Sequence, residues 1–266
     1  MCNQKPELNQ KPDKNAPIGV FDSGVGGLTV AREIMRQMPE ERIVYFGDTA
    51  RVPYGSKSQD TIIRYSRQII RFLMTKHVKA IVIACNTASA YALATVEKEF
   101  DVPIIGVIRA GARTAVQVTR NGKIGVIATE GTIGSGIYTQ EIKKLRPDIE
   151  VTGKPCPLFV PLVEEGLLHD SVTDEIASRY LSSLKSRFVD TLVLGCTHYP
   201  LIRSTLGRLM GNDVTLVNPA YETAIELRDL LQKYGLSCDE EKTGGEKYQF
   251  FVSDQTEKFT AFATSI

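Results

Sequence analysis

The chain has 266 residues, enough for one large α/β unit or two small domains with cores of their own. Its 32 Lys and Arg residues almost balance 31 Asp and Glu residues, and the net charge of +1 offers no basic excess for nucleic acid or an anionic membrane. No apolar run reaches the roughly 18 residues that a membrane-spanning helix needs. We therefore expect a globular protein with neither nucleic acid nor membrane as a partner.

The chain begins with a polar stretch, residues 1–16, that is rich in Lys, Asn, Gln and Pro. It lacks the apolar core of a secretory signal, so we expect a disordered or loosely attached extension. The cysteines are odd in number and widely spaced, which argues against a disulfide framework and favours a reducing, cytoplasmic location. They are Cys2, Cys85, Cys156, Cys196 and Cys238.

Short apolar runs rich in Val and Ile, flanked by Gly, Pro or polar residues, predict buried parallel strands. In chain order they are Ile18–Phe21, Ile43–Phe46, Ala80–Ala84, Ile104–Val107, Ile124–Ala128, Thr191–Leu194, Val214–Val217 and a further candidate, Tyr248–Val252. Segments with helical spacing lie among them at Asp60–His77, Ser171–Arg187, Tyr221–Tyr234 and, for a short helix, Thr256–Phe262. Strands that alternate with helices predict an α/β fold with parallel, doubly wound sheets.

The sequence contains an internal repeat. Residues Ala80–Ser89 read AIVIACNTAS and residues Thr191–Pro200 read TLVLGCTHYP, each an apolar strand followed by a small residue, a Cys and polar groups. Upstream, Ile18–Gly27 reads IGVFDSGVGG and Ile124–Ile133 reads IGVIATEGTI. The matching order predicts two α/β halves built to one plan.

The repeat places two cysteines at equivalent points. Cys85 lies 67 residues after Ile18, and Cys196 lies 72 residues after Ile124. Open α/β sheets bind ligands outside the carboxyl ends of their strands, so halves that face each other would point both thiols into one cleft. Each Cys also lies where a strand leads into a helix, and we expect the backbone N–H groups there to favour a thiolate or a bound carboxylate.

Two facing thiols suit a defined reaction. Inverting a stereocentre at carbon requires that one group removes a proton from one face and another returns a proton to the opposite face. The carbanion between these steps needs a closed site lined with dipoles. Cys85 and Cys196 therefore predict a racemase that needs no cofactor, whereas Cys2, Cys156 and Cys238 have no such partner and are expected to be small buried hydrophobes.

At these residues the chain resembles the glutamate racemases of bacterial cell-wall synthesis. The matching segments are PIGVFDSGVGGLTV (Pro17–Val30), FGDTARVPYGSKS (Phe46–Ser58), ACNTASA (Ala84–Ala90), VPLVEEG (Val160–Gly166) and GCTHYPL (Gly195–Leu201). The resemblance implies two domains related by a pseudo-twofold axis with the active site between them, no metal, no pyridoxal phosphate and a homodimer. It also implies interconversion of L- and D-glutamate, which supplies D-glutamate for peptidoglycan.

The resemblance also assigns roles to residues. It makes Cys85 the base that acts on D-glutamate and Cys196 the base that acts on L-glutamate, assisted by Asp22 and His198 respectively. Asp48 and Glu164 match further acidic catalytic positions. The positions that match substrate-binding residues are Asp22, Ser23, Pro53, Tyr54, Gly55, Cys85, Asn86, Thr87, Cys196, Thr197 and His198.

Without the resemblance, several of these residues have structural alternatives. Asp22 can accept backbone N–H groups in a turn, and Asp48 can begin a loop. Asn86 and its neighbour Thr87, like Thr197, can cap the helix that follows. Glu164 can be a solvated helix residue.

The domain organisation follows from the repeat. The second domain is predicted to be 110–218, and the first is predicted to be discontinuous, 17–109 together with 219–266, because the last strand and helix can pack back on it. Residues 1–16 form the extension, which is longer than the stretch before the same motif in the shortest members of the family.

Three other functions remain open on the residues alone. A racemase of another small acid such as aspartate would use the same chemistry with a different pocket length. Cys85, Cys196 and His198 could be ligands of a hydrolytic zinc, although zinc sites usually show closely spaced ligand pairs and a clear set of three or four. A two-domain binding protein would use the same cleft without turnover.

Overall fold

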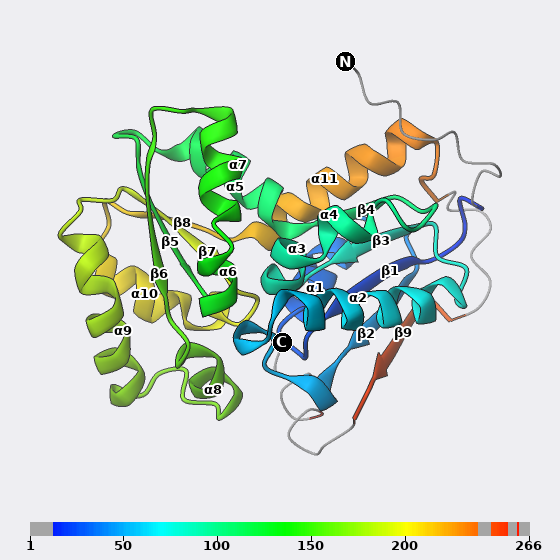
Figure 1. Ribbon diagram of the computed structural model, residues 1–266, viewed down its shortest axis with the longest axis horizontal. Coiled ribbons are helices and arrows are strands. Elements are labelled where there is room, and N and C mark those ends of the chain that lie inside the picture. The colour runs from blue at the N-terminus through cyan, green and yellow to red at the C-terminus, as the bar shows by residue number, and fades with distance from the viewer. Residues whose placement is uncertain (1–12, 239–245, 255–259, 261–266) are drawn as a thin grey trace.

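The computed structural model describes residues 13–238, 246–254 and 260. Its strands form two sheets, each at the centre of one lobe of the molecule (Figure 1), and every strand pairing is parallel. The strands are β1 (Ile18–Asp22), β2 (Ile43–Gly47), β3 (Ala80–Ile83), β4 (Ile104–Gly106), β5 (Lys123–Ala128), β6 (Glu150–Pro155), β7 (Thr191–Gly195), β8 (Thr215–Val217) and β9 (Tyr248–Val252). All eight predicted strands are confirmed, and β6 was missed.

Helices connect these strands, and the three longest begin at polar capping residues. The Ser58 hydroxyl accepts the N–H of Thr61 at the start of α2, and the Asp170 and Asn218 side chains do the same for α9 and α11. The predicted helix Thr256–Phe262 lies almost wholly outside the described residues. The helices are α1 (Leu28–Gln37), η1 (Thr49–Arg51), η2 (Tyr54–Ser56), α2 (Gln59–Met74), α3 (Asn86–Tyr91), α4 (Leu93–Val96), α5 (Val107–Val118), α6 (Glu130–Gly134), α7 (Ile137–Leu145), α8 (Phe159–Glu164), α9 (Ser171–Lys185), η3 (Tyr199–Ile202), α10 (Arg203–Met210) and α11 (Pro219–Tyr234).

Strand β6 escaped prediction because its sequence, EVTGKP, has one large apolar residue. It is an edge strand that pairs only with β5, from Lys123 opposite Glu150 to Ala128 opposite Pro155. Its side chains are all partly or fully exposed. An edge strand does not need the continuous apolar run of a central parallel strand, and charged residues there discourage pairing with other chains.

The sheet topology repeats. The first sheet has the order β4-β3-β1-β2-β9, and the second, read from its β8 edge, has the order β8-β7-β5-β6. Strands one to four of the chain therefore match strands five to eight in both order and direction, and β9 is an addition beside β2. The two α/β halves that the repeat predicted are confirmed.

Alternating side chains divide the core into three parts. Val20 of β1 and Val126 of β5 belong to one apolar cluster that also includes residues of α1, α5 and α11, so the two halves share this part of the core. Phe21 packs on the opposite face of the first sheet with α2, α3 and α4, and Leu194 packs with α8, α9 and α10. Each fully buried side chain of this size stabilises the fold by roughly 1.5–3 kcal/mol relative to an exposed one.

The chain crosses between the halves through two equivalent helices. Helix α5 follows β4 and packs on α7 and β7, whereas α11 follows β8 and packs on both α1 and α5. Strand β9 then joins the first sheet beside β2. These contacts agree with a first domain that is completed by the end of the chain, and the domain boundaries themselves stay a prediction.

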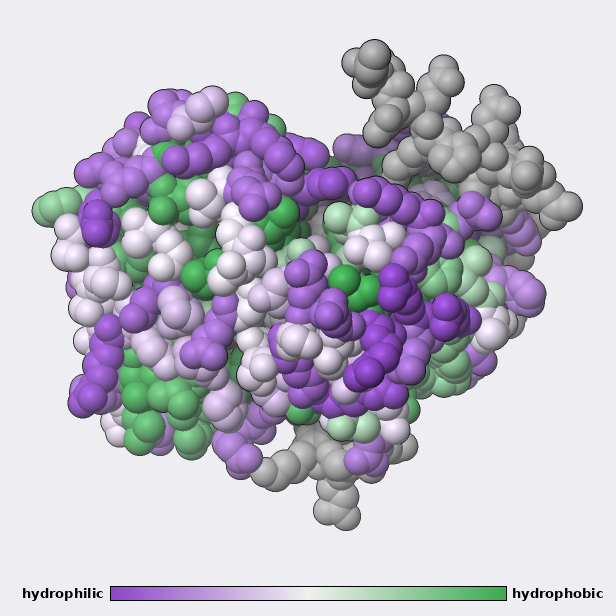
Figure 2. Space-filling model, in the orientation of Figure 1, coloured by the Kyte–Doolittle hydropathy of each residue, from purple (hydrophilic) through white to green (hydrophobic). Residues whose placement is uncertain are grey.

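The surface is largely polar. The face in Figure 2 is mostly hydrophilic or neutral, with an apolar area at the lower left where Figure 1 places α8 and α9. Leu158, next to α8, and Val172, in α9, are about half exposed. Within the described residues no helix has the length and apolar character needed to cross a bilayer.

Candidate active site

A pocket lies between the two halves, at the carboxyl ends of their strands, with a volume of about 380 Å³ when the open space at its mouth is included. Both predicted thiols line it, although Cys85 and Cys196 are only 6% and 7% exposed. The structure therefore brings the two cysteines to one pocket. The lining residues are Ser23, Val52, Pro53, Tyr54, Gly55, Cys85, Asn86, Thr87, Thr129, Val160, Glu164, Gly195, Cys196, Thr197 and His198.

Most of the predicted site residues line this pocket, and two lie behind its wall: Asp22 and Asp48 are fully buried and outside the lining. The prediction missed four residues of the lining, namely Val52, Thr129, Val160 and Gly195. The repeat held a signal for one of them, because aligning IGVFDS with IGVIAT puts Thr129 at the position of Ser23.

Cys85 is a buried thiol at the end of β3. Its Sγ accepts the N–H of Ala88 at 3.5 Å, so Cys85 itself caps α3, while Asn86 and Thr87 lie in the first turn. Burial, followed by the charge of Asp22, raises the pKa of the Cys85 thiol to about 12, against the opposing hydrogen bonds from Ala88 and Ser23. The N–H group at the helix start favours the thiolate here, as expected, but burial and the charge of Asp22 outweigh it.

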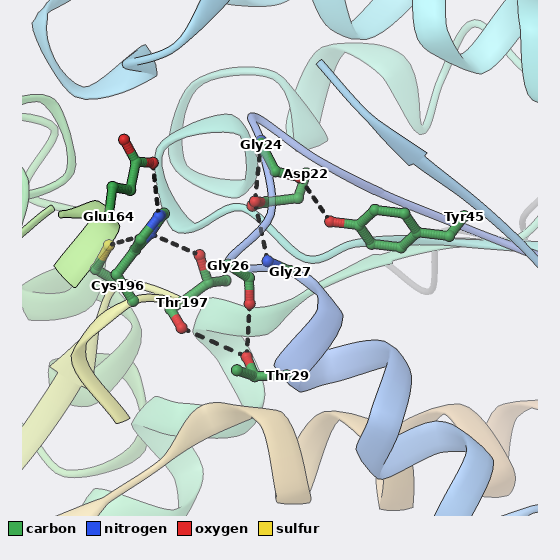
Figure 3. Close-up of polar contacts among 10 residues, drawn as sticks. Asp22, Gly24, Gly26, Gly27, Thr29, Tyr45, Glu164, Cys196 and Thr197 are labelled. Atoms are coloured by element: carbon green, nitrogen blue, oxygen red, sulfur yellow. Dashed lines mark hydrogen bonds and ion pairs between the residues drawn. The ribbon is translucent and has the colours of Figure 1, made fainter. Parts of the chain in front are cut away.

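Cys196 has a histidine beside it (Figure 3). Its Sγ lies 3.8 Å from His198 Nδ1, and His198 Nε2 lies 3.0 Å from Oε1 of Glu164, which α8 carries. Burial opposes a charge on His198, but hydrogen bonds with Cys196 and Glu164 and the negative charges nearby outweigh it and raise the histidine pKa to about 10. The arrangement is a Cys–His–Glu chain that can move a proton to or from the sulfur. We call residues 196–198 the Cys196 loop.

Asp22 organises the loop that follows β1, residues 22–27, which we call the Asp22 loop. Its Oδ2 accepts the N–H groups of Gly24 at 3.1 Å and Gly27 at 3.0 Å, and Tyr45 Oη donates to the Gly24 carbonyl at 2.8 Å (Figure 3). Burial raises the pKa of Asp22, although the charge of His198 and the backbone N–H groups lower it. Asp22 therefore does accept backbone N–H groups in a turn, which was the structural alternative for this residue. Oδ1, buried and without a hydrogen bond among the described residues, leaves the carboxyl a free oxygen.

Asp48 supports the wall of the pocket. Tyr54 Oη donates to Asp48 Oδ2 at 2.5 Å, and Arg51 Nη1 lies 3.5 Å from the same oxygen. Burial and the charge of Asp48 raise the pKa of Tyr54 well above its usual value, so its hydroxyl stays protonated. Asp48 therefore holds the tyrosine that lines the pocket rather than reaching the cavity itself.

Neutral donors join the two halves at the pocket. The Oγ1 atom of Thr87 lies 2.9 Å from that of Thr129 and 3.2 Å from that of Thr132. Tyr138 Oη donates to Asn86 Oδ1 at 2.7 Å, which leaves the amide nitrogen of Asn86 as its remaining donor. None of the residues that line the pocket in the described chain is Lys or Arg. A bound carboxylate would therefore be held by hydroxyl and amide groups.

The comparisons with known proteins agree with this geometry. The family model described as Asp/Glu/Hydantoin racemase matches residues 18–225. The chain belongs to this racemase family. It is 51% identical to a glutamate racemase of Geobacter metallireducens, over 89% of this chain and 87% of that protein. The prediction of the family is confirmed.

Solved structures give the same result. The fold matches a glutamate racemase of Bacillus anthracis with a TM-score of 0.90 at 42% identity, covering 95% of this chain and 94% of that one. It matches a Francisella tularensis glutamate racemase in complex with D-glutamate with a TM-score of 0.88 at 41% identity, covering 95% and 93%. The predicted fold of two parallel-sheet α/β domains is confirmed.

The pocket of this racemase offers thiols and neutral donors. Among the described residues, no three His, Cys, Asp or Glu side chains are grouped in a way that could hold a metal ion. What the lining does offer is one sulfur from each half, a histidine beside one of them and several hydroxyl and amide donors. These groups can transfer protons at a carbon and hold the carboxylates of a small acid.

Proposed function

We propose that this chain interconverts L- and D-glutamate through two proton transfers, with Cys85 and Cys196 on opposite faces of the substrate's α-carbon. One observation carries the proposal: buried thiols from equivalent strands of the two halves line the same pocket. The glutamate racemases among its relatives support glutamate as the substrate. The reaction calls for no cofactor, because the thiols supply both the base and the acid.

The proposed steps balance in each direction. With L-glutamate, the Cys196 thiolate removes the α-proton and becomes a thiol, while the Cys85 thiol donates its proton to the opposite face and becomes a thiolate. D-glutamate follows the reverse path. His198 and Glu164 assist Cys196, and Asp22 assists Cys85.

The protonation of the site favours one starting direction. The raised pKa of Cys85, about 12, keeps this sulfur protonated at neutral pH, as an acid must be when L-glutamate is the substrate. Before D-glutamate can react, Cys85 must lose that proton, and Asp22 is the carboxylate whose charge acts on it. His198 can supply a proton to Cys196 in that direction.

The remaining lining residues would bind the substrate. Ser23, Asn86, Thr87 and Thr197 offer hydroxyl or amide donors to the two carboxylates, and Tyr54, its neighbour Gly55 and Pro53 shape the wall. Neutral donors hold a carboxylate without placing a Lys or Arg side chain beside Cys85. A positive charge beside Cys85 would lower the pKa of this thiol and weaken its hold on the proton that it must donate when L-glutamate reacts.

The test is circular dichroism of L- and D-glutamate with purified, dialysed protein, and of both enantiomers of aspartate in parallel. Wild-type protein should invert glutamate and incorporate deuterium at the α-carbon in deuterated water. C85S and C196S should each lower the rate of racemisation by about 10²–10⁴-fold, because each removes one acid/base group.

C156S is the matched control, since Cys156 is a fully buried thiol outside the pocket lining. It should keep its activity once folding is verified by thermal melting. Unchanged turnover in both C85S and C196S would refute the mechanism. Inversion of aspartate in preference to glutamate would support the alternative substrate, and no inversion of either would favour a binding protein.

Several wider expectations belong to the same proposal. We infer that the product D-glutamate enters peptidoglycan, that the protein is a cytoplasmic homodimer and that its first domain is 17–109 with 219–266. Growth of a D-glutamate auxotroph that expresses the chain tests the first. Cell fractionation and light scattering test the location and the dimer, and limited proteolysis near residues 109 and 218 tests the domain boundaries.

A further inference from the structure

The Asp22 loop and the Cys196 loop touch each other beside the pocket. Gly26 faces the second half so closely that a methyl group on it would lie 2.7 Å from His198 Nδ1 and nearer still to the Thr197 hydroxyl. No real side-chain carbon approaches other atoms to that distance, so the contact requires a glycine. The Gly26 backbone of the first half therefore packs directly against Thr197 and His198, the two residues that follow Cys196.

Thr29 ties the same two loops together with its hydroxyl (Figure 3). This side chain lies in the first turn of α1 and is 3% exposed. Its Oγ1 lies 2.8 Å from the Gly26 carbonyl oxygen and 3.4 Å from the Thr197 carbonyl oxygen. The two carbonyls share the one hydroxyl proton, and the contact with Gly26 is the shorter. Thr197 is the residue between Cys196 and His198, so the longer contact reaches the backbone that carries the thiol and its proton partner.

Hydrogen bonds hold the Asp22 loop behind Thr29 in place. Asp22 accepts two N–H groups of its own loop, and Tyr45 of β2 holds the Gly24 carbonyl. A bond from such a loop fixes the position of what it contacts, and a misplacement of about 1 Å can cost about 100-fold in rate. A shift of the Cys196 loop away from Thr29 would change the distance between Cys196 and the α-carbon of a bound substrate.

We propose that Thr29 is a positioning residue, which holds the Cys196 loop against the Asp22 loop and so sets the reach of the second base. The inference rests on the proposed function. The local alternative is that Thr29 only bonds the carbonyl of Gly26 three residues before it, which is an ordinary pattern at the start of a helix. That alternative affects stability and leaves proton transfer untouched.

The experiment compares T29V, which removes the hydroxyl at nearly constant size, with T29S, which keeps it. T29V should lower kcat/KM by about 10–100-fold. The loss should be equal for both enantiomers, because their equilibrium constant is one. T29S should stay close to wild type.

T223V is the matched control. Thr223 is fully buried in α11 and its hydroxyl donates at 2.7 Å to the carbonyl of Pro219, four residues before it, which is a comparable local bond that does not involve the Cys196 loop. T223V should lower the melting temperature without changing the kinetics.

Deuterium isotope effects decide between positioning and stability. In T29V, transfer to and from Cys196 becomes slower, so the effect with α-deuterated L-glutamate should rise while that with α-deuterated D-glutamate should fall. Isotope effects are ratios and do not depend on the fraction of folded enzyme. If T29V does not fold, T29A gives the same comparison.

The inference is overturned if T29V keeps kcat/KM within about 2-fold of wild type, or if both isotope effects stay unchanged while stability falls. A failure of this inference can be told apart from a failure of the proposed function. If the wild-type protein does not invert glutamate, the proposed function fails before any variant is measured. If it does and T29V matches it, only the role of Thr29 fails.

Discussion

The two halves of the molecule place a thiol at the same point of the same topology and then surround it differently. Asp22 ends β1 beside Cys85, but the residue at the equivalent end of β5 is Ala128. His198 lies two residues after Cys196, and the equivalent residue after Cys85 is Thr87. The shared topology therefore sets where the sulfurs lie, and single side chains set how each one exchanges a proton.

A second contrast lies at the opposite ends of the same strands. Lys79 precedes β3 and Asp190 precedes β7. The Lys79 ammonium forms a buried ion pair with Glu41 at 2.5 Å and donates to the Lys14 carbonyl oxygen, whereas the Asp190 carboxylate accepts the N–H of Arg120 at 2.7 Å. Lys14 and Arg120 both lie shortly before the first strand of their half. Side chains of opposite charge at equivalent positions thus hold the equivalent segment of each half, the one that leads into its first strand.

Breaking the ion pair of the first half should have the largest effect on stability. K79M leaves Glu41 charged and buried without its partner, so we expect the free energy of unfolding to fall by about 3–5 kcal/mol. Urea unfolding measures it. The double variant K79M/E41Q removes the orphaned charge and keeps an acceptor for the Cys238 N–H, so it should regain much of the loss. A K79M protein as stable as wild type would show that the pair contributes nothing.

Replacing each of the two assisting groups, Asp22 and His198, tests the contrast at the active site. D22N and H198N should each lower kcat by about 100-fold, because each removes a proton partner of one thiol. Asn at position 22 can still accept the N–H groups of Gly24 and Gly27, so the loop should persist. The isotope effect should rise with α-deuterated D-glutamate in D22N and with the L-enantiomer in H198N.

Two outcomes would contradict this asymmetry. One is a rise in the isotope effect with the same enantiomer in both variants. The other is faster turnover of D-glutamate in D22N, which would mean that Asp22 only keeps Cys85 protonated. Thermal melting of both variants separates either outcome from a loss of folded protein.

Replacing Asp190 in the second half should have the smallest effect on stability, and this effect should depend on pH. Burial of Asp190 opposes its charge, but hydrogen bonds from Thr119, Asn121, Arg120 and Thr191 outweigh it and lower the carboxyl pKa. A carboxyl with a lowered pKa in the folded state contributes stability above its unfolded pKa of about 3.9 and loses it as the pH falls through the folded value. D190N should therefore cost about 1–3 kcal/mol at pH 7.

The difference between the same variant and wild type should begin to shrink as the pH falls below about 3.9 and should vanish only below the lowered folded-state pKa, where the wild-type carboxyl is protonated as well. Denaturant unfolding from pH 7 down to about pH 2 measures this difference. A difference that stays constant over that range would show that hydrogen-bond geometry, rather than charge, makes the contribution of Asp190.

Much of the fold was predictable because its signals are local. Buried parallel strands need continuous Val- and Ile-rich runs, and these predicted β1 to β5 and β7 to β9 within a few residues. Strand β6 gave no such signal, since an edge strand needs only one paired side. Thr129 could have been found from the repeat, whereas Val52 and Val160 reach the pocket through packing that no local pattern records.

The sequence by itself determined that this chain has two parallel α/β halves and that each carries a Cys after an equivalent strand, because strand periodicity and repeated motifs are properties of adjacent residues. Only the tertiary structure decided which groups act on those sulfurs: Glu164 behind His198, Asp48 beneath Tyr54 and Thr29 against Thr197. These partners lie on different elements or in different halves. Distances between such groups are set by how the helices and sheets pack, and pKa values follow from those distances and from burial.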